Sequence, residues 1–465
     1  MPEPTIYDVA IIGAGVVGAA VARELAQYNL RCVLIEAGED VGAGTSKANT
    51  AILHTGFDAK PGYLETRLVQ RGYQLLKDYS AQTGIPVEPL GAVLVAWEED
   101  QLRALPAIRE AAHRNNSPDV EIISVEELYR LEPKLGAGAL GALIVPRESI
   151  ICPFTVPIAY ATQAVVNGVT LRLNSPVQRI ERTPEGDYLL YTPSEATITS
   201  RYLVNVAGLY ADTINRMLGY DEFGVIPRRG QLLVFDKMSR GLVNHILLPV
   251  PSKMGKGVLI SPTVFGNVML GPTAENLSDK SATETTADGI AMLLDKGKRI
   301  LPDLLDEEVT AMYAGLRAST QHDDFQIYLH EQARYLCIGG IRSTGLSASL
   351  AIAEYAVERL AEAGLKLDRK AEFQTITMPN LGEAFPRPYQ SDEMIRQNPD
   401  YGRIVCHCER VTRGEILDAT HSVIPACSAD SLRRRTRAQM GRCQGFFCAA
   451  EVDALLTESQ KAAAL

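Results

Sequence analysis

Apolar and polar positions follow two different spacings along the first 40 residues. Residues 7–12 form a short apolar run, which is typical of a strand buried in a parallel sheet. Residues 13–18 contain three glycines, and after them apolar residues recur at helical spacing to about residue 27. Residues 31–36 form a second apolar run. The pattern therefore predicts a strand, a tight turn, a helix and a second strand.

The chain between residues 90 and 365 mixes both spacings. The pattern predicts strands at 90–97, within 188–206, within 230–271 and at 336–340, and helices at 98–114, after the capping pair Ser124 and Glu127, and at 346–360. Residues 378–400 carry four prolines among polar residues and are predicted to be a linker. The remainder, from residue 401, differs in composition, since it holds eight arginines and five of the eight cysteines.

Composition narrows the class of protein. A chain of 465 residues with 46% hydrophobic and 22% charged residues is expected to form two to four globular domains. The formal net charge of −10 argues against a general nucleic-acid binder. No run of 18 apolar residues is present, and the acidic Glu3 and Asp8 argue against a signal peptide. We expect a cytoplasmic location, with peripheral association at the inner face of the membrane as the alternative.

Three glycines and an acidic residue in the N-terminal unit indicate a dinucleotide site. Gly13 permits the tight turn, Gly15 lets the backbone approach a pyrophosphate at the helix N-terminus, and Gly18 allows close helix–strand packing. Glu36 ends the next strand, where its carboxylate can accept hydrogen bonds from ribose hydroxyls. Both FAD and NAD are bound by such a unit, so the pattern alone leaves the choice open.

Residues 42–62, which include Thr45, Ser46 and the His54-Thr-Gly56 stretch, resemble the D-amino-acid-oxidase-like flavoprotein superfamily. Within it, the glycerol-3-phosphate dehydrogenases and oxidases and the L-2-hydroxyglutarate oxidases are most similar. Residues 205–208 and 339–345 match the family's later FAD contacts in the same order. The resemblance implies FAD as the cofactor, with contacts from Gly13, Gly15, Gly18, Glu36, Thr45, Ser46, Asn49, Val177, Gly208, Gly340, Gly345 and Leu346.

The resemblance also implies the fold class and the domains. We expect an α/β protein with a discontinuous Rossmann-like FAD-binding domain, an inserted β-rich α+β substrate domain and a small C-terminal helical domain that holds most of the cysteines. The expected boundaries are 1–75, 150–220 and 330–377 for the FAD-binding domain; 76–149 and 221–329 for the substrate domain; 378–400 for the linker; and 401–465 for the C-terminal domain.

Oxidation of a secondary alcohol needs a hydride acceptor and a base for the hydroxyl proton. His54 is the candidate base, because imidazole titrates near neutral pH and the resemblance places this position beside the flavin ring. The alternatives are a histidine that contacts or covalently holds the flavin and one that only packs locally.

A small anionic substrate needs fixed positive charge, and the arginine fork matches phosphate or carboxylate oxygens. Arg317 matches an arginine that binds substrate in the family and is a candidate for catalysis as well as binding. The further candidates are Lys256, Arg342, Ser343 and Thr344; for the basic ones a surface salt bridge is the alternative. Some glycerol-3-phosphate dehydrogenases carry lysine where this chain has Ile341, which leaves the substrate open between glycerol 3-phosphate and a 2-hydroxyacid such as L-2-hydroxyglutarate.

Four cysteines have a spacing that fits a metal site: C-x-C, then 34 residues, then C-x4-C. They are Cys406, Cys408, Cys443 and Cys448, and four thiolates can hold a 2Fe–2S cluster or zinc. The C-x-C pair favours iron and sulfur over zinc, with a metal-free site as a third option. The segment resembles the bacterioferritin-associated-ferredoxin-like 2Fe–2S domain, through residues 404–412, 434–437 and 441–445, although His407 and Phe446 depart from the common pattern. Cys427 is expected to be a buried thiol outside the ligand set.

The arginines around residue 435 admit two interpretations. They are either solvated charge that compensates the anionic cluster, or a docking surface for an acidic electron acceptor or partner subunit. A cluster favours a dehydrogenase over an oxidase, with electrons passing to an acceptor such as a quinone. The alternatives are a dehydrogenase of other 2-hydroxyacids, an amine or amino-acid oxidase of the same superfamily, and a non-catalytic electron-transfer subunit. No nucleic-acid partner is expected.

Overall fold

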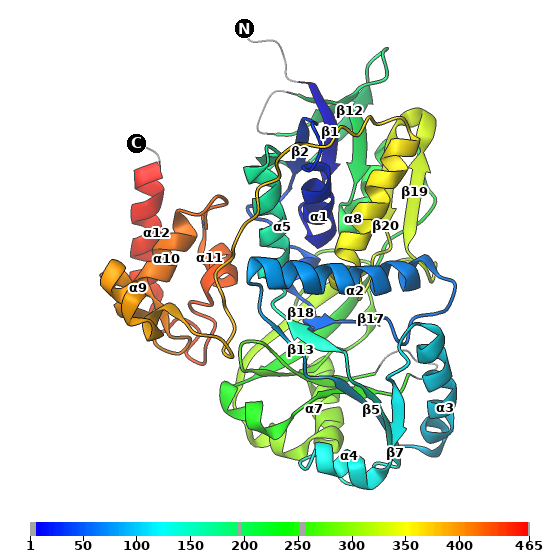
Figure 1. The fold of residues 1–465 in the computed structure, drawn as a ribbon, viewed down its shortest axis with the longest axis vertical. Helices are drawn as coiled ribbons and strands as arrows, with labels where there is room; N and C mark the ends of the chain where they lie inside the picture. The colour runs from blue at the N-terminus through cyan, green and yellow to red at the C-terminus, as the bar shows by residue number, and fades with distance from the viewer. Residues whose placement is uncertain (1–5, 194–196, 252–256, 464–465) are drawn as a thin grey trace.

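A computed structural model describes residues 6–193, 197–251 and 257–463 of the chain. Figure 1 shows two large sheets, one above the other, with the C-terminal helices forming a separate body at one side. The predicted α/β class is confirmed, with a Rossmann-like parallel sheet, a second β-rich part and a small helical C-terminal domain. None of the helices in these ranges is long and apolar enough to cross a membrane.

The first sheet has eight strands and contains the predicted N-terminal unit. Its parallel centre places β1 between β2 and β12, and short antiparallel pairs extend its edges. The strands are β1 (Ile6–Ile12), β2 (Cys32–Ile35), β9 (Thr170–Arg172), β10 (Arg179–Arg182), β11 (Tyr188–Tyr191), β12 (Ile198–Asn205), β19 (Gln326–His330) and β20 (Tyr335–Gly339). The run of buried apolar residues in β1 and β2 explains their central place, because a strand covered on both faces has no polar side.

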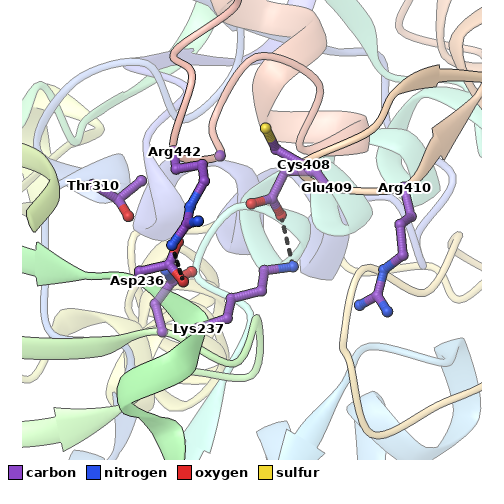
Figure 2. Close-up of a pocket in the computed structure, with 9 residues that line it drawn as sticks. Asp236, Lys237, Thr310, Cys408, Glu409, Arg410 and Arg442 are labelled. Carbon is purple, nitrogen blue, oxygen red and sulfur yellow. Dashed lines mark hydrogen bonds and ion pairs between the residues drawn. The ribbon is translucent and has the colours of Figure 1, made fainter. Parts of the chain in front are cut away.

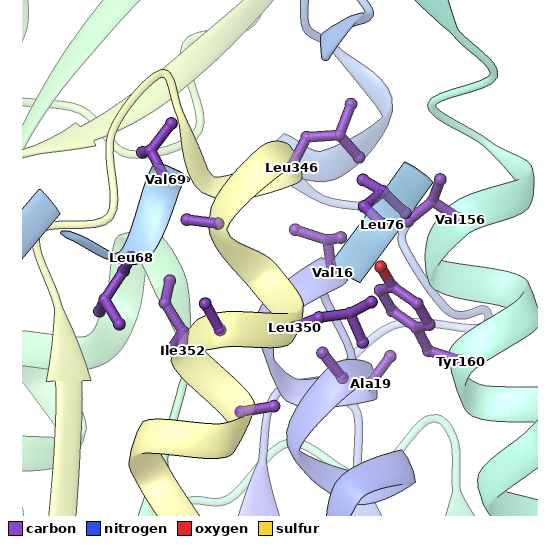
Figure 3. Close-up of a cluster of buried hydrophobic side chains, with 14 of the residues drawn as sticks. Val16, Ala19, Leu68, Val69, Leu76, Val156, Tyr160, Leu346, Leu350 and Ile352 are labelled. Carbon is purple, nitrogen blue, oxygen red and sulfur yellow. The ribbon is translucent and has the colours of Figure 1, made fainter. Parts of the chain in front are cut away.

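Four helices cover one face of this sheet, and small residues let them approach closely. They are α1 (Val16–Leu25), α2 (Leu64–Thr83), α5 (Thr155–Val166) and α8 (Gly345–Glu362). A Cβ at Gly72 of α2 would lie 2.3 Å from the carbonyl oxygen of Ser347, so the α2–α8 crossing requires glycine. Figure 3 shows Val16 and Ala19 beside Leu350 and Tyr160 in the resulting core. Each large apolar side chain buried here stabilises the fold by roughly 1.5–3 kcal/mol.

The second sheet has nine strands and forms the lower part of the molecule in Figure 1. Its longest pair is the antiparallel ladder of β13 with β18. The strands are β5 (Ala92–Ala96), β6 (Glu121–Ile123), β7 (Gly141–Val145), β13 (Ile226–Phe235), β14 (Ile246–Pro249), β15 (Leu259–Pro262), β16 (Val268–Gly271), β17 (Glu275–Asn276) and β18 (Val309–Ser319). Helices α3 (Glu99–Arg114), α4 (Val125–Leu131) and α7 (Ala287–Ile300) pack against it, while α6 (Ala211–Met217) packs against the first sheet.

A small three-stranded sheet joins the two large parts. It consists of β3 (Ile52–Leu53), β8 (Ser149–Ile151) and β4 (Val87–Glu88), with β8 in the middle. Because β3 pairs with β8 antiparallel, with Leu53 opposite Ser149, the residues at the adjoining ends of these strands come together. The domain boundaries given above remain predictions.

The C-terminal domain has its own apolar core. Its elements are β21 (Ile404–Cys406), β22 (Val411–Thr412), α10 (Arg413–Thr420), α11 (Ala429–Thr436) and α12 (Ala449–Ala463). The segment predicted as a linker is more ordered than proline content indicates, since it holds α9 (Asp392–Gln397) and the buried Arg387. Arg387 donates a 2.7 Å hydrogen bond to Glu415, which fixes the end of this segment on α10.

Candidate active site and cysteine module

The glycine turn after β1 has the geometry that a bound pyrophosphate requires. Gly13 has φ +107°, and a Cβ there would lie 2.6 Å from the carbonyl oxygen of Val206. A Cβ at Gly18 would lie 1.8 Å from the carbonyl oxygen of Gly13. Both positions therefore exclude every larger residue, and the start of α1 stays close to the sheet, where its backbone N–H groups can face an anion.

Glu36, just after β2, accepts a hydrogen bond from the backbone of this turn. Its carboxylate accepts hydrogen bonds from the backbone N–H of Ala14, at 2.7 Å, and of Gly38, at 2.8 Å. A carboxylate has about four lone-pair directions, so these two bonds leave acceptor capacity for hydroxyl donors. Ser46 Oγ accepts from the backbone N–H of Val16 at 2.9 Å, which brings the 45–49 segment onto the same helix end. These residues fit the adenosine and pyrophosphate parts of FAD.

Strand β18 crosses directly over the 45–49 segment. Thr45 Oγ1 donates a 2.9 Å hydrogen bond to the carbonyl oxygen of Leu316, and Tyr313 Oη donates at 3.0 Å to that of Asn49. A Cβ at Gly315 would lie 2.5 Å from the carbonyl oxygen of Ala48, so the backbones are in contact there. This crossing brings Arg317, at the end of β18, to the expected flavin segment.

Arg317 is a mostly buried cation with little to neutralise it. Its Nη1 is 3.4 Å from the carbonyl oxygen of Thr273, and no carboxylate pairs with it in the part of the chain that the structure describes. Burial, with the nearby charge of Arg228 as a second cause, lowers the pKa of Arg317 to about 10, so it remains charged at neutral pH. A buried cation is costly without a counter-ion, and an anionic ligand would satisfy this one.

His54 follows β3 directly, and its ring meets a buried carboxylate that no sequence motif predicts. Its ring Nδ1 lies 2.9 Å from Oε2 of Glu148, which is fully buried. Its backbone N–H donates at 2.8 Å to Ser347 Oγ, in the first turn of α8. Because 94 residues separate His54 from Glu148, no local pattern could have predicted the pair.

The other predicted substrate residues have mixed environments. Arg342 Nη2 donates at 2.9 Å to Glu65, and Thr344 Oγ1 donates at 2.7 Å to the same carboxylate. Ser343 is exposed, and Lys256 lies outside the described residues. The substrate roles of these four residues stay predictions.

The remaining predicted FAD residues lie along the first sheet and its helices. Asn49 donates at 2.8 Å to the carbonyl oxygen of Ser46, and Val177 packs half-buried against the core of the sheet. Gly208 and Gly340 have positive φ values, +57° and +63°, while Gly345 begins α8 and is followed by the buried Leu346. Their contacts with FAD stay predictions.

The four predicted ligand cysteines gather in the C-terminal domain. Their thiols contact each other in pairs, Cys408 with Cys443 and Cys406 with Cys448. A hydrogen bond from the backbone N–H of Phe447 is the main cause that lowers the pKa of Cys443, as suits a thiolate ligand. Within residues 6–193, 197–251 and 257–463, no three His, Cys, Asp or Glu side chains are arranged to hold a single metal ion. Four neighbouring thiols from two segments, residues 406–408 and 443–448, fit the ligand set of a cluster.

Cys427 corrects one expectation. It was predicted to be a buried thiol, but it is exposed, and its Sγ lies 3.6 Å from the carbonyl oxygen of Glu39. It lies at the contact between the C-terminal domain and the loop after β2, in the irregular segment between α10 and α11. It takes no part in the pairs of ligand thiols.

The arginines of α11 also differ from both interpretations. Arg434, Arg435 and Arg437 are buried rather than solvated, and they bind carboxylates of the same chain rather than an external partner. Arg434 and Arg435 bind Asp40, in the loop after β2, and Arg437 binds Glu409. The charge therefore docks the C-terminal domain onto the FAD-binding part of its own chain.

A cavity of about 360 Å³ separates the C-terminal domain from the second sheet beside Cys408 (Figure 2). Lys237 bridges it by a 3.1 Å ion pair with Glu409, and Arg442 pairs with Asp236 at 3.2 Å. On the loop between two ligand cysteines, Phe446 and Phe447 are 84% and 78% exposed. The contact between the C-terminal domain and the second sheet is thus polar and ion-paired, while the loop between Cys443 and Cys448 presents two aromatic rings to solvent.

Comparisons with known proteins agree with this division of the chain. Residues 8–359 match the family described as FAD dependent oxidoreductase, and residues 404–458 match the BFD-like [2Fe-2S] binding domain. A glycerol 3-phosphate dehydrogenase of Caloramator mitchellensis is 38% identical over 454 residues, covering 97% of this chain and 94% of that protein. The part of this chain outside the alignment is too short to contain the C-terminal domain, so the alignment with this relative includes that domain.

Two further matches cover about four fifths of the chain or less. A glycerol 3-phosphate oxidase of Mycoplasma pneumoniae is 33% identical over 361 residues, covering 76% of this chain and 94% of that protein. A solved structure of L-alpha-glycerophosphate oxidase from Mycoplasma pneumoniae with FAD bound has a TM-score of 0.75 and 31% identity, and it covers 81% of this chain and 99% of that chain. FAD and a 2Fe–2S cluster are therefore the cofactors of the two parts.

Proposed function

The chain belongs to the FAD dependent oxidoreductase family, and from this premise we propose that it oxidises sn-glycerol 3-phosphate to dihydroxyacetone phosphate. The observation that carries the proposal is Arg317, a mostly buried arginine without a carboxylate partner in the described chain, on a strand that crosses the expected flavin segment. Relatives that act on this substrate, by their names, support the same choice.

Each residue of the site has a distinct task in this reaction. The guanidinium of Arg317 binds two oxygens of the substrate phosphate and fixes the position of the adjacent carbinol. His54 accepts the hydroxyl proton at Nε2, the ring nitrogen that does not face Glu148. FAD, when bound, supplies the two-electron acceptor for the hydride that leaves C2 of the substrate.

We infer a dehydrogenase rather than an oxidase from the C-terminal domain. The cluster, when bound, supplies a one-electron acceptor, which an enzyme that reduces oxygen directly does not need. The docking of this domain through Asp40 keeps it on the FAD-binding part of the same chain. The electrons then pass to a quinone or a partner subunit at the cytoplasmic face of the membrane.

Anaerobic titration of the purified holoenzyme tests the substrate. Flavin absorbance is followed after addition of glycerol 3-phosphate, L-2-hydroxyglutarate or an amino acid, each in separate samples. We expect rapid bleaching with glycerol 3-phosphate and little with the others. Faster bleaching by L-2-hydroxyglutarate would make a 2-hydroxyacid the substrate, and no bleaching by any of the three would favour an electron-transfer subunit.

A further inference from the structure

Glu148 lies opposite His54 because of the register between two short strands. Leu53 of β3 pairs with Ser149 of β8, and the next residues outward on each strand are His54 and Glu148. The Nδ1–Oε2 distance between them is 2.9 Å, and the Glu148 side chain is 0% exposed. A fully buried carboxylate is retained only where donors satisfy it, so its partners identify its task.

Both carboxylate oxygens of Glu148 are engaged, and each by a different residue. Oε1 accepts from the backbone N–H of Thr55 at 2.7 Å and from Thr55 Oγ1 at 2.8 Å, which leaves Oε2 for the His54 ring. The backbone of His54 is fixed in turn by its bond to Ser347 Oγ on α8. Ser347 therefore fixes the backbone of His54, while Glu148 holds the ring at Nδ1 and restricts its rotation.

The ionised carboxylate determines which ring nitrogen carries the hydrogen. An ionised carboxylate only accepts hydrogen bonds, so the neutral ring must place its hydrogen on Nδ1. Nε2 then has a free lone pair, and it makes no hydrogen bond within the part of the chain that the structure describes. Nε2 is thereby the only ring position that can take a proton.

We propose that Glu148 is the positioning residue for His54, holding it as the Nδ1–H tautomer and stabilising the imidazolium after it takes the substrate proton. This inference rests on the proposed function, in which His54 is the base. The substrate hydroxyl proton moves to Nε2 while Glu148 keeps its hydrogen bond to Nδ1, and FAD, when bound, would accept the hydride from C2. The proton then leaves Nε2 to solvent before the next turnover.

The chain offers a matched control for this pair. Glu132 is also 0% exposed, and its Oε1 lies 2.7 Å from Nδ1 of His245 and accepts from the backbone N–H of the same residue. It directly follows α4, and its carboxylate bonds the backbone of Asn244 and His245, just before β14 of the second sheet. Substitution of Glu132 therefore removes a similar buried carboxylate without touching the proposed base.

Glu148→Gln is the decisive variant. The two donors of Thr55 require the amide oxygen, so the amide NH₂ turns toward Nδ1 and forces the hydrogen of His54 to Nε2. We expect kcat to fall by about 10²–10⁴-fold, the range for loss of general-base catalysis, with KM changed less than about threefold. Glu148→Asp keeps the charge and is expected to recover at least about tenfold over Glu148→Gln, while Glu132→Gln keeps the parent kcat.

A readout without turnover separates this inference from the proposed function. In protein labelled with ¹⁵N-histidine, the His54 ring signals are identified by their loss in His54→Asn. We expect Nδ1–H in the parent and in Glu132→Gln, and Nε2–H in Glu148→Gln. An unchanged tautomer in a folded Glu148→Gln would overturn the inference. If the tautomer changes but His54→Asn retains full activity, Glu148 orients the ring and the assignment of His54 as the base is wrong.

Discussion

Arg435 of α11 binds Asp40 through two parallel hydrogen bonds, Nη1 to Oδ2 and Nη2 to Oδ1, each 2.7 Å long. Arg434 adds a 2.5 Å bond to the same Oδ2, and all three side chains are at most 5% exposed. A bidentate pair excluded from water has a defined geometry. The C-terminal domain is therefore held in one position on the loop that follows β2.

Asp40→Asn should release this domain. The substitution leaves the buried guanidinium of Arg435 without a carboxylate and Arg434 with Asp430 alone, and breaking a buried pair on one side costs roughly 3–5 kcal/mol. We expect faster proteolysis within residues 378–400 and slower cluster reduction in stopped-flow mixing with substrate, while the first flavin bleaching stays unchanged. Glu39→Gln is the control, because Glu39 is exposed and contacts Ser428 at the rim. Equal proteolysis of Asp40→Asn and the parent would contradict the docking role.

The same contact predicts a response to acid. Burial alone would raise the pKa of Asp40, but hydrogen bonds and charges from Arg435 and Arg434 outweigh it and hold the pKa below its usual range. Docking therefore has its full stability above the ordinary aspartate pKa of about 3.9 and loses it as pH falls through the lower docked value. Small-angle scattering should show an unchanged shape from pH 7 to about 5. Release of the domain within that interval would contradict the prediction.

Arg317→Met should weaken binding of the substrate phosphate specifically. Loss of charge-assisted hydrogen bonds is expected to lower kcat/KM for glycerol 3-phosphate by about 10²-fold or more, while the slow oxidation of uncharged glycerol is unaffected. Steady-state assays with both substrates check this difference. Arg228→Met is the control, since the exposed Arg228 lies opposite Arg317 in the β13–β18 ladder. An equal loss with both substrates would indicate a structural role instead.

Cys443→Ser should separate the two cofactors. Loss of one thiolate is expected to abolish the cluster absorbance and most of the bound iron, while glycerol 3-phosphate still bleaches the flavin. Iron analysis of the parent should give about two irons per chain, as a 2Fe–2S cluster requires. Cys427→Ser should match the parent in both measurements, because Cys427 is exposed and outside the thiol pairs. Stoichiometric zinc in place of iron would contradict the cluster.

Sequence patterns predicted the parts of the site that depend on neighbouring residues. The β1–α1–β2 unit and its glycines follow from local spacing, since turn geometry and helix packing restrict those positions directly. The grouping of the four cysteines is predictable for the same reason, because their spacing in two short pairs is visible in the sequence, and the structure brings the two pairs together.

Contacts between distant segments were not predictable. Glu148 and Asp40 acquire their roles from partners 94 and 395 residues away along the chain, and neither stands in a recognisable motif. Composition predicts that the arginines around residue 435 are either solvated charge or a docking surface for an external acidic partner. Their burial depends on a contact between domains that composition does not reveal. Cys427 was placed inside for a similar reason, since cysteine is more often buried than exposed.

The pairing of Leu53 with Ser149 sets a practical rule for building chimeras of this enzyme. Successive side chains of a strand point to opposite faces, so a graft that shifts β8 by one residue would turn Glu148 away from the ring of His54. Recombination between homologues should therefore exchange residues 52–55 and 148–151 together, from a single parent.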